Sequence, residues 1–305
     1  MDKCLPEYQP LTLADRQLTE HYLALTDYRL SRYNFINLWM YNNWIPLFYC
    51  VKEDIMLCLS HYRDHYFSYM PLCAKERLPR AFELIEAMYH TCELPFIYAC
   101  FEDEIADMIL TRHPDFEKRP YRDSFDYIYE IERFRDFSGK KLQKKRNHLN
   151  NFYQTYPNFE YQEINENNLP AVISYTKQWY QRHQGTFLQH DEVGNLEVLQ
   201  NFPALAAEGG CLLVDQKIIA FIIATYQRAD TIQVNIEKAS DEYRGSYQAI
   251  LRELLKRKFT DVRYMNREDD LGLDNLRQAK MSYHPDILLG NYRICAKGDH
   301  VDYES

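Results

Sequence analysis

The chain lacks the residue spacings that mark metal sites and nucleophilic catalytic centres. Its eight cysteines and ten histidines are scattered, with no C-x-x-C pair and no paired histidine spacing. No Ser-His-Asp or Cys-His order is recognisable. We therefore expect no bound metal, and scattered thiols of this kind are typical of a reducing cytosol. A metal hydrolase is correspondingly disfavoured.

Long apolar runs are also missing. The most apolar stretch, Cys211–Tyr226, is broken by Asp215-Gln216-Lys217, so we expect no integral membrane segment. The N-terminal sequence MDKCLPEYQPLTLADRQ lacks the basic-then-apolar order of a signal peptide. These two observations favour a soluble, cytoplasmic protein.

Positive charge is in deficit and unevenly placed. Thirty-six Lys and Arg against 45 Asp and Glu give a formal net charge of −9, which disfavours a general nucleic-acid or membrane coat. Five cations nevertheless gather in seven residues: Lys140, Lys141, Lys144, Lys145 and Arg146. On a helix several of them share one face. That face is either simply solvated, or it captures phosphate from tRNA, CoA or an anionic lipid headgroup.

What the chain does contain is a near-repetition of itself. The hairpin Leu47–Ser60 coincides with Gly210–Ile223 after a shift of 163 residues, and the following strands, Phe67–Leu72 and Asp230–Asn235, stay in step. With three more residues inserted, ACFEDEI from Ala99 aligns with MNREDDL from Met265. A repeat this long is no solenoid unit. It predicts two domains of one fold.

Periodicity predicts the same order of elements in both halves, namely a hairpin, a strand, a helix, a strand and a helix. This order favours an α+β architecture with a mixed, twisted sheet flanked by helices, used twice. The segment 113–123 contains Pro114 and Pro120 and is expected to be a linker. We therefore predict domains at 1–118 and 119–305.

The junction Val234–Ala249 (VNIEKASDEYRGSYQA) is the best candidate for a phosphate site. A predicted strand ends, Arg244-Gly245 follow, and a helix begins, so free N–H groups and the positive helix end would face a phosphate. Acyl-CoA acyltransferases of the GNAT fold carry R-G-x-G-x-G/A at this junction. Arg244, Gly245 and Ala249 match that pattern, whereas Tyr247 replaces the central glycine. An ordinary N-terminal turn is the plainer interpretation.

The whole chain also resembles a more specific group. These are tandem-GNAT proteins related to the C-terminal domain of bacterial phosphatidylglycerol lysyltransferases and, more distantly, to the Fem peptidyltransferases. The resemblance is carried by Tyr33-Asn34-Phe35, Gly139–Asn147 (GKKLQKKRN), Ile236–Ala239 (IEKA), Tyr243–Tyr247 and Asn266–Tyr283. It implies acyl or aminoacyl transfer in a cleft of the second domain, between the strands 231–238 and 262–266.

Several polar residues near that expected cleft are candidates for chemistry. Glu237 is the candidate base, since amide formation requires proton removal from the attacking amine, and Tyr247 and Tyr283 are candidate acids or orienting hydroxyls. Donor phosphates would bind Lys144, Lys145, Arg146, Arg244 and Gly245. Substrate contacts are expected from Tyr264, Asn266, Arg267 and Asp269. The alternatives are a strand-end ion pair for Glu237, helix capping for the acids of 268–270, and packing for each tyrosine.

Two functions therefore stay open. In the first, the chain is an acyltransferase whose second domain is active and whose first is degenerate. It would have no tightly bound cofactor, would use aminoacyl-tRNA or acyl-CoA as co-substrate, and would acylate an amine or a hydroxyl. In the second, it is a non-catalytic duplicated scaffold that binds a phosphorylated ligand or a partner protein.

Overall fold

The computed structural model describes residues 5–299 except 64 and 184, and it forms two compact units. The first unit contains residues up to 125 together with 289 onwards, and the second contains 126–288. The expected division placed everything after 118 in the second half. The C-terminal segment belongs to the first unit instead, because its strand β14 (Tyr292–Ala296) pairs with β5 (Ile97–Phe101) and β6 (Phe116–Pro120).

The first unit has a mixed sheet of seven described strands. Its order is β1-β2-β3-β4-β5-β14-β6, and β4 and β5 are its parallel pair. The remaining strands are β1 (Gln9–Pro10), β2 (Leu47–Lys52), β3 (Ile55–Tyr62) and β4 (His65–Ser68). Its helices are α1 (Arg16–Leu23), α2 (Phe35–Met40), α3 (Leu78–Thr91) and α4 (Asp103–Arg112). Residues 116–120 of the expected linker thus form strand β6.

The sheet of the second unit has the order β8-β9-β10-β11-β12-β7-β13, which corresponds to the first sheet strand for strand. Its strands β11 and β12 are parallel, as β4 and β5 are in the first sheet. The strands are β7 (Asp126–Glu130), β8 (Glu160–Glu163), β9 (Glu208–Val214), β10 (Lys217–Arg228), β11 (Thr231–Ala239), β12 (Tyr264–Asn266) and β13 (Ile287–Leu289). The fold class predicted from the sequence, two mixed sheets flanked by helices, is confirmed.

In chain order the strands form two successive sets, β1–β7 and β8–β14. The last strand of each set joins the sheet that the other set builds. Strand β6 closes the edge of the first sheet, but the next strand, β7, pairs with β12 in the second. At the other end β13 closes the edge of the second sheet, and β14 enters the first. The two units therefore exchange equivalent strands.

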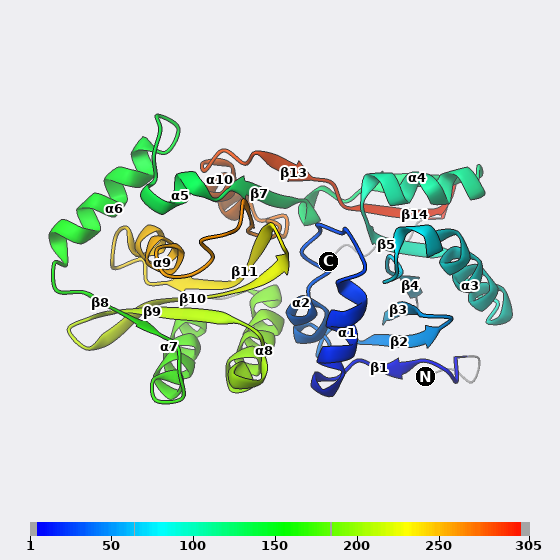
Figure 1. The fold of residues 1–305 in the computed structure, drawn as a ribbon, viewed down its shortest axis with the longest axis horizontal. Helices are drawn as coiled ribbons and strands as arrows, with labels where there is room; N and C mark the ends of the chain where they lie inside the picture. Colours follow the sequence, from blue (N-terminus) through cyan, green and yellow to red (C-terminus); the bar gives the residue numbers. More distant parts are fainter. Residues whose placement is uncertain (1–4, 64, 184, 300–305) are drawn as a thin grey trace. The chain divides into compact units, whose positions relative to one another are not determined.

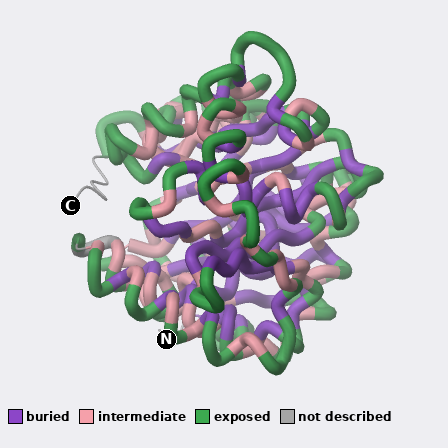
Figure 2. The backbone as a smooth tube through the Cα atoms, turned by 90° about the vertical axis from the view of Figure 1, so that its left-hand side faces the viewer, coloured by how far each residue is buried: buried purple, intermediate pink, exposed green. Residues whose placement is uncertain are grey.

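The helices of the second unit are α5 (Glu132–Asp136), α6 (Gln143–Thr155), α7 (Leu169–Arg182), α8 (Thr186–Gln200), α9 (Ser246–Leu255) and α10 (Asp274–Met281). Helix α9 covers one face of the sheet, and α7 and α8 lie on the other (Figure 1). The main core forms between α9 and the strands, where Ile222, Ile232 and Leu254 are fully buried. Buried backbone follows the strands, and exposed segments lie outside them (Figure 2).

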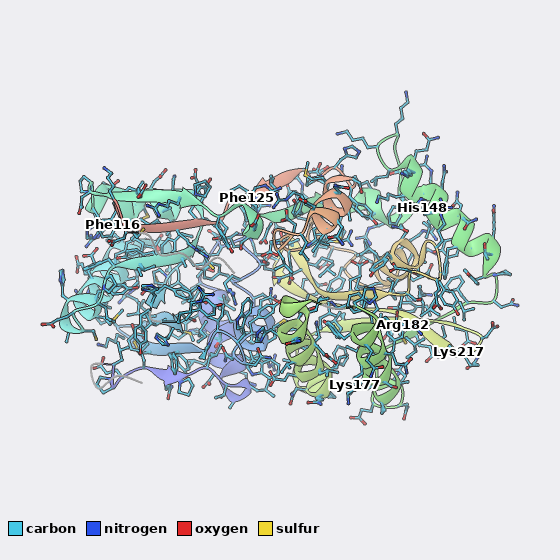
Figure 3. All side chains as sticks on the ribbon, turned by 180° about the vertical axis from the view of Figure 1, so that it is seen from behind. Phe116, Phe125, His148, Lys177, Arg182 and Lys217 are labelled. Atoms are coloured by element: carbon cyan, nitrogen blue, oxygen red, sulfur yellow. The ribbon has the colours of Figure 1, made fainter. Side chains whose placement is uncertain are left out.

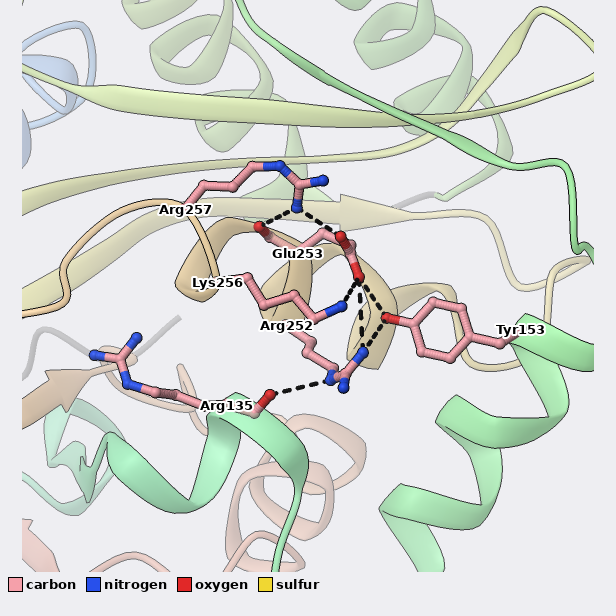
Figure 4. Close-up of polar contacts among 6 residues, drawn as sticks. All are labelled: Arg135, Tyr153, Arg252, Glu253, Lys256 and Arg257. Atoms are coloured by element: carbon pink, nitrogen blue, oxygen red, sulfur yellow. Dashed lines mark hydrogen bonds and ion pairs between the residues drawn. The ribbon is translucent and has the colours of Figure 1, made fainter.

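Helix α6 is fastened to α9 by a network around Glu253, whose side chain is 5% exposed (Figure 4). The hydroxyl of Tyr153 donates to Glu253 Oε1 at 2.6 Å, and Lys256 and Arg257 reach the same carboxylate. Arg252 bonds Tyr153 and the backbone of α5. Burial alone would raise the pKa of Glu253, but these three donors lower it. The network fixes α6, the helix that carries Lys144, Lys145 and Arg146, against α9.

Candidate functional site

The parallel strands β11 and β12 separate after three paired positions. Their register runs from Thr231 opposite Tyr264 to Gln233 opposite Asn266, where β12 ends and β11 continues to Ala239. Among the described residues, no strand pairs with β11 beyond this point on that side. This opening of the pairing, here called the splay, lies where a cleft is expected from the sequence; the cleft itself stays a prediction.

A β-bulge in β11 then sets which side chains face α9. Ile236 lies opposite Ile223, but Val234 lies opposite Ala224, so Asn235 is the extra residue. Because the bulge shifts the alternation by one, Val234 and Ala239 pack in the same core despite their odd separation. Glu237, two residues before Ala239, consequently faces α9.

Glu237 forms an ion pair with Arg267, the first residue after β12. Their side chains are 9% and 11% exposed, respectively. Burial alone would lower the pKa of Arg267, but the carboxylate of Glu237 and the ring of Tyr283 raise it. The alternative expected from the sequence was an exposed ion pair at the end of the strand. The ion pair in the structure is instead almost buried.

Two atoms of this ion pair are buried without a hydrogen-bond partner among the described residues. They are Glu237 Oε1 and Arg267 Nη1. Buried polar atoms are almost always bonded, so such orphans mark strain or a ligand position. Here an acceptor and a donor lie on two partners of one ion pair, where the strands separate.

The ring of Tyr283 contacts both Arg267 of this pair and Lys145 of α6. Its ring lies 4.9 Å from the guanidinium carbon of Arg267 and 4.0 Å from Lys145 Nζ. Gln248 of α9 donates to its hydroxyl at 2.6 Å. Burial raises the pKa of Tyr283, so its hydroxyl stays protonated. Sequence reasoning missed Gln248, although it stands one helical turn after Arg244.

Tyr247, in the first turn of α9, lies near the same pair. Burial, with the charge of Glu237 adding to it, raises the pKa of Tyr247 to about 12. A tyrosine with this pKa is a proton donor at neutral pH and not a base. Glu237, Tyr247 and Tyr283 are thus placed close together, while their catalytic roles remain predictions.

The expected phosphate-binding residues divide into two groups. Lys144 is exposed on α6, and no ion-pair partner is described for it. Arg146 instead points into the fold, where its guanidinium donates to the carbonyl oxygens of Phe137 at 2.7 Å and Gly139 at 3.2 Å. Arg146 therefore holds the loop before α6, which explains its presence without a phosphate.

The Arg244-Gly245 corner is packed against α6. Gly245 has φ +95°, and a Cβ there would overlap the carbonyl oxygen of His148. The guanidinium of Arg244 reaches the ring of His148 at 3.4 Å. The glycine is thus required by helix packing, which weakens its assignment to a pyrophosphate loop.

The remaining substrate candidates have structural partners. The side chain of Asn266 donates to Asp126 at 3.0 Å and accepts the N–H of Glu268 at 2.7 Å. Tyr264 pairs with Thr231 at the start of the ladder, at the opposite end of β12 from the splay. The backbone oxygen of Asp269 accepts a bond from Lys280.

Asp270 shows what the acidic run does. Its carboxylate is fully buried, accepts bonds from Arg277 and the Tyr127 hydroxyl, and receives the N–H of Gly272 at 3.0 Å. The acids before α10 therefore organise the loop that carries Arg267.

Lys238, next to Glu237, faces the opposite side of the sheet. Its Nζ lies 2.8 Å from Asp191 of α8 and 4.5 Å from the ring of Trp179 on α7. A cavity of about 460 Å³ opens beside these helices, lined by Tyr180, Gln181, His183, Gly185, Leu188, Gln189 and Glu192. None of the expected site residues lines it.

The first unit lacks the Glu237–Arg267 pair. Ser68 pairs with Tyr98 there as Thr231 pairs with Tyr264. Counted along the sequence from this pair without a gap, Ala74 and Phe101 stand at the positions of Glu237 and Arg267. Its splay is bridged by Tyr33, whose hydroxyl donates to the Cys100 oxygen at 2.7 Å and accepts the Met70 N–H at 2.8 Å. This explains the first residue of the Tyr33-Asn34-Phe35 motif.

Comparisons with known proteins agree with this architecture. Residues 23–295 match the family model described as phosphatidylglycerol lysyltransferase, C-terminal. An uncharacterized protein of Mycoplasmoides gallisepticum is 29% identical over 180 residues, and the match spans 57% of this chain and 57% of that protein. No described helix is long and apolar enough to cross a membrane.

Solved structures extend the similarity over the whole chain. A conserved protein of unknown function from Bacteroides thetaiotaomicron is 28% identical with a TM-score of 0.88, covering 95% of this chain and 99% of that one. The structure of L-PGS from Bacillus licheniformis is 16% identical with a TM-score of 0.68, covering 94% and 93%. FemX is 9% identical with a TM-score of 0.57, covering 94% and 96%. At these two lower identities the likeness concerns the fold alone.

Proposed function

The chain belongs to the phosphatidylglycerol lysyltransferase C-terminal family, and from this premise we propose that its second unit is an acyl- or aminoacyltransferase. The donor would be an activated ester or thioester, and the acceptor an amine or a hydroxyl. The first unit would be a degenerate copy, since Ala74 and Phe101 replace the ion pair and Tyr33 fills the splay. A cytoplasmic location stays a prediction.

The unpartnered atoms Glu237 Oε1 and Arg267 Nη1 carry this proposal. They leave one acceptor and one donor without a hydrogen-bond partner within a single ion pair. An aminoacyl group offers the complement, because its ammonium can donate to Glu237 and its carbonyl oxygen can accept from Arg267. A plain acetyl group offers only the carbonyl. Aminoacyl-tRNA is therefore the favoured donor.

The surface around the pair supports a polyanionic donor. Lys140, Lys141 and Lys144 are exposed near the start of α6, and no ion pair is described for any of them. Phosphates of tRNA would approach along this helix. Acyl-CoA is less favoured, because α6 packs directly on the Gly245 corner. The non-catalytic alternative keeps the same surface but consumes no donor.

A transfer assay with binding at several salt concentrations tests the proposal. Purified protein is offered charged tRNA and acyl-CoA thioesters, and saturable binding and release of the acyl group are measured. We expect charged tRNA to bind and to lose its aminoacyl group. Binding of acyl-CoA alone would contradict the aminoacyl assignment, and binding of a phosphorylated ligand without turnover would support the scaffold.

The variant Lys140→Gln, Lys141→Gln, Lys144→Gln should weaken tRNA binding. It should also lower the slope of log affinity against log salt by roughly 0.7–0.9 for each phosphate contact removed. The matched control is Lys177→Gln, Arg182→Gln, Lys217→Gln, which removes the same charge from exposed positions on α7 and the β9–β10 hairpin (Figure 3). An equal effect of both triples would mean that α6 has no specific role.

A further inference from the structure

Lys145 differs from the other three lysines of the segment 140–146. It is half-buried, whereas Lys140, Lys141 and Lys144 are exposed. No carboxylate pairs with it among the described residues, and its Nζ lies 4.0 Å from the ring centre of Tyr283. The same ring contacts Arg267. Lys145 and Arg267 of the Glu237–Arg267 pair therefore contact the same aromatic ring.

The charged groups around Lys145 are mainly cationic. Lys144 and His148 accompany it on α6, and Arg267 approaches from the end of β12. Arg244 lies beside His148 at the α9 corner, and Tyr283 stays protonated. Glu237, the acid of the site, is already paired with Arg267. Burial, followed by the charges of Arg267 and Lys144, lowers the pKa of Lys145 to about 8.

This environment suits a base better than a phosphate contact. A lysine that binds phosphate works as an ammonium, and its partner anion would favour the charged form. Here the surroundings favour the neutral amine, which is the form that can take up a proton. Glu237 is less available for that task, because its carboxylate is already paired with the guanidinium of Arg267.

We propose that Lys145 is the proton acceptor of the transfer reaction, an assignment that rests on the proposed function. The acceptor's nitrogen or oxygen attacks the donor carbonyl carbon, and the new C–N or C–O bond forms as its proton passes to Lys145 Nζ. The bond from the carbonyl carbon to the leaving oxygen or sulfur then breaks. The ammonium of Lys145 returns the proton to that leaving group, so the enzyme ends unchanged.

The decisive variant is Lys145→Arg, because arginine keeps the positive charge but does not release its proton. We expect the transfer rate of the parent to rise with pH through about 8 and then level off, since the neutral amine is the active form. Lys145→Arg should lower this rate by roughly 10²–10⁴-fold, the usual contribution of a positioned base, and should abolish the rise. Donor binding should change little.

Lys177→Arg is the matched control, since it makes the same exchange on an exposed lysine of α7 that lies outside the proposed site. It should keep both the rate and the pH dependence. Glu237→Gln should keep the rise near pH 8 even where its rate is reduced. Loss of the rise in Glu237→Gln and its retention in Lys145→Arg would overturn the proposal and make Glu237 the base.

A second measurement does not need activity. Reductive ¹³C-methylation and NMR titration report the pKa of individual lysines, and Lys145→Arg identifies the resonance. We expect Lys145 to titrate near pH 8, below the ordinary value of a lysine. An ordinary value for Lys145 would overturn the assignment even in an active enzyme. A Lys145 that titrates near 8 in a protein without any transfer activity would overturn the proposed function, and the base assignment with it.

Discussion

At the scale of single residues, the site depends on charges placed where water is scarce. Glu237 and Arg267 are each almost buried, and each leaves one polar atom unsatisfied. Breaking such a pair costs more than the pair itself contributes, because the remaining charge has no partner. We therefore expect the unsatisfied atoms of the pair to lower folding stability and, at the same time, to offer a ligand a donor and an acceptor.

Arg267→Met should destabilise the protein by about 3–5 kcal/mol, since it leaves the carboxylate of Glu237 buried and alone. The double variant Glu237→Gln, Arg267→Met should be less destabilised than Arg267→Met by itself. Arg263→Met is the control, because Arg263 pairs with Glu130 on the surface, where their side chains are 67% and 51% exposed. It should change the free energy of unfolding much less than Arg267→Met does.

Urea denaturation of the parent, Arg267→Met, Glu237→Gln, the double variant and Arg263→Met measures these differences. Equal losses for Arg267→Met and Arg263→Met would contradict a buried pair. A double variant that loses the sum of both single effects would show that the two side chains do not interact.

At the scale of elements, the position of α6 decides whether Lys145 can reach Tyr283. Two features fix it: the Glu253 network with α9, and the close approach of the His148 backbone to Gly245. Neither is a long-range electrostatic effect. They hold α6 at the two ends of α9, since Gly245 caps its start and Glu253 lies in its last turn.

Gly245→Ala should destabilise the second unit and disturb the α6–α9 contact. Alanine pays about 1–2 kcal/mol for the left-handed backbone at φ +95°, and its methyl group would overlap the His148 carbonyl, adding about 1–3 kcal/mol. Gly139→Ala is the matched control. Its φ is +82° but nothing lies within 4 Å of the added Cβ, so only the backbone cost applies.

Thermal or urea unfolding compares the two glycine variants, and hydrogen exchange reports on α6. We expect faster exchange in α6 for Gly245→Ala only. Equal stability of the two variants would show that α6 does not pack on Gly245 as closely as described.

At the scale of the whole molecule, one unit is built from a single segment of the chain and the other from two segments. The second unit is one continuous segment, 126–288, whereas the first requires β14 from the far end of the chain. Within the first sheet, β14 lies between β5 and β6. Without it, β6 has no partner and the edge of β5 is exposed.

A fragment of residues 126–290 should therefore fold alone, while a fragment of residues 1–125 should not. Adding a peptide of residues 289–299 should restore structure to the latter, because the peptide supplies β14. Circular dichroism and NMR dispersion of each fragment, with and without peptide, make the test. A scrambled peptide is the control, and independent folding of 1–125 would contradict the role given to β14.

Much of this molecule follows from local patterns in the sequence. The alternation and turns of Leu47–Ser60 and Gly210–Ile223 predicted both hairpins, and the repeated order of elements predicted two mixed sheets with helices. The polar strand end at Glu237 and the residues Arg267 and Tyr283 were also identified as candidates. Patterns of this kind are local, because backbone periodicity and turn residues act over a few positions.

Only the tertiary structure decided how those pieces combine. The exchange of β7 and β14 joins strands from opposite halves of the chain, and no local pattern specifies a partner that distant. The bulge at Asn235 turned Glu237 toward α9, and packing directed Arg146 inward while leaving Lys144 in water. Lys145 became distinct from its neighbours only when Tyr283 and Arg267 came against it, because burial and neighbouring charges arise from the assembled fold.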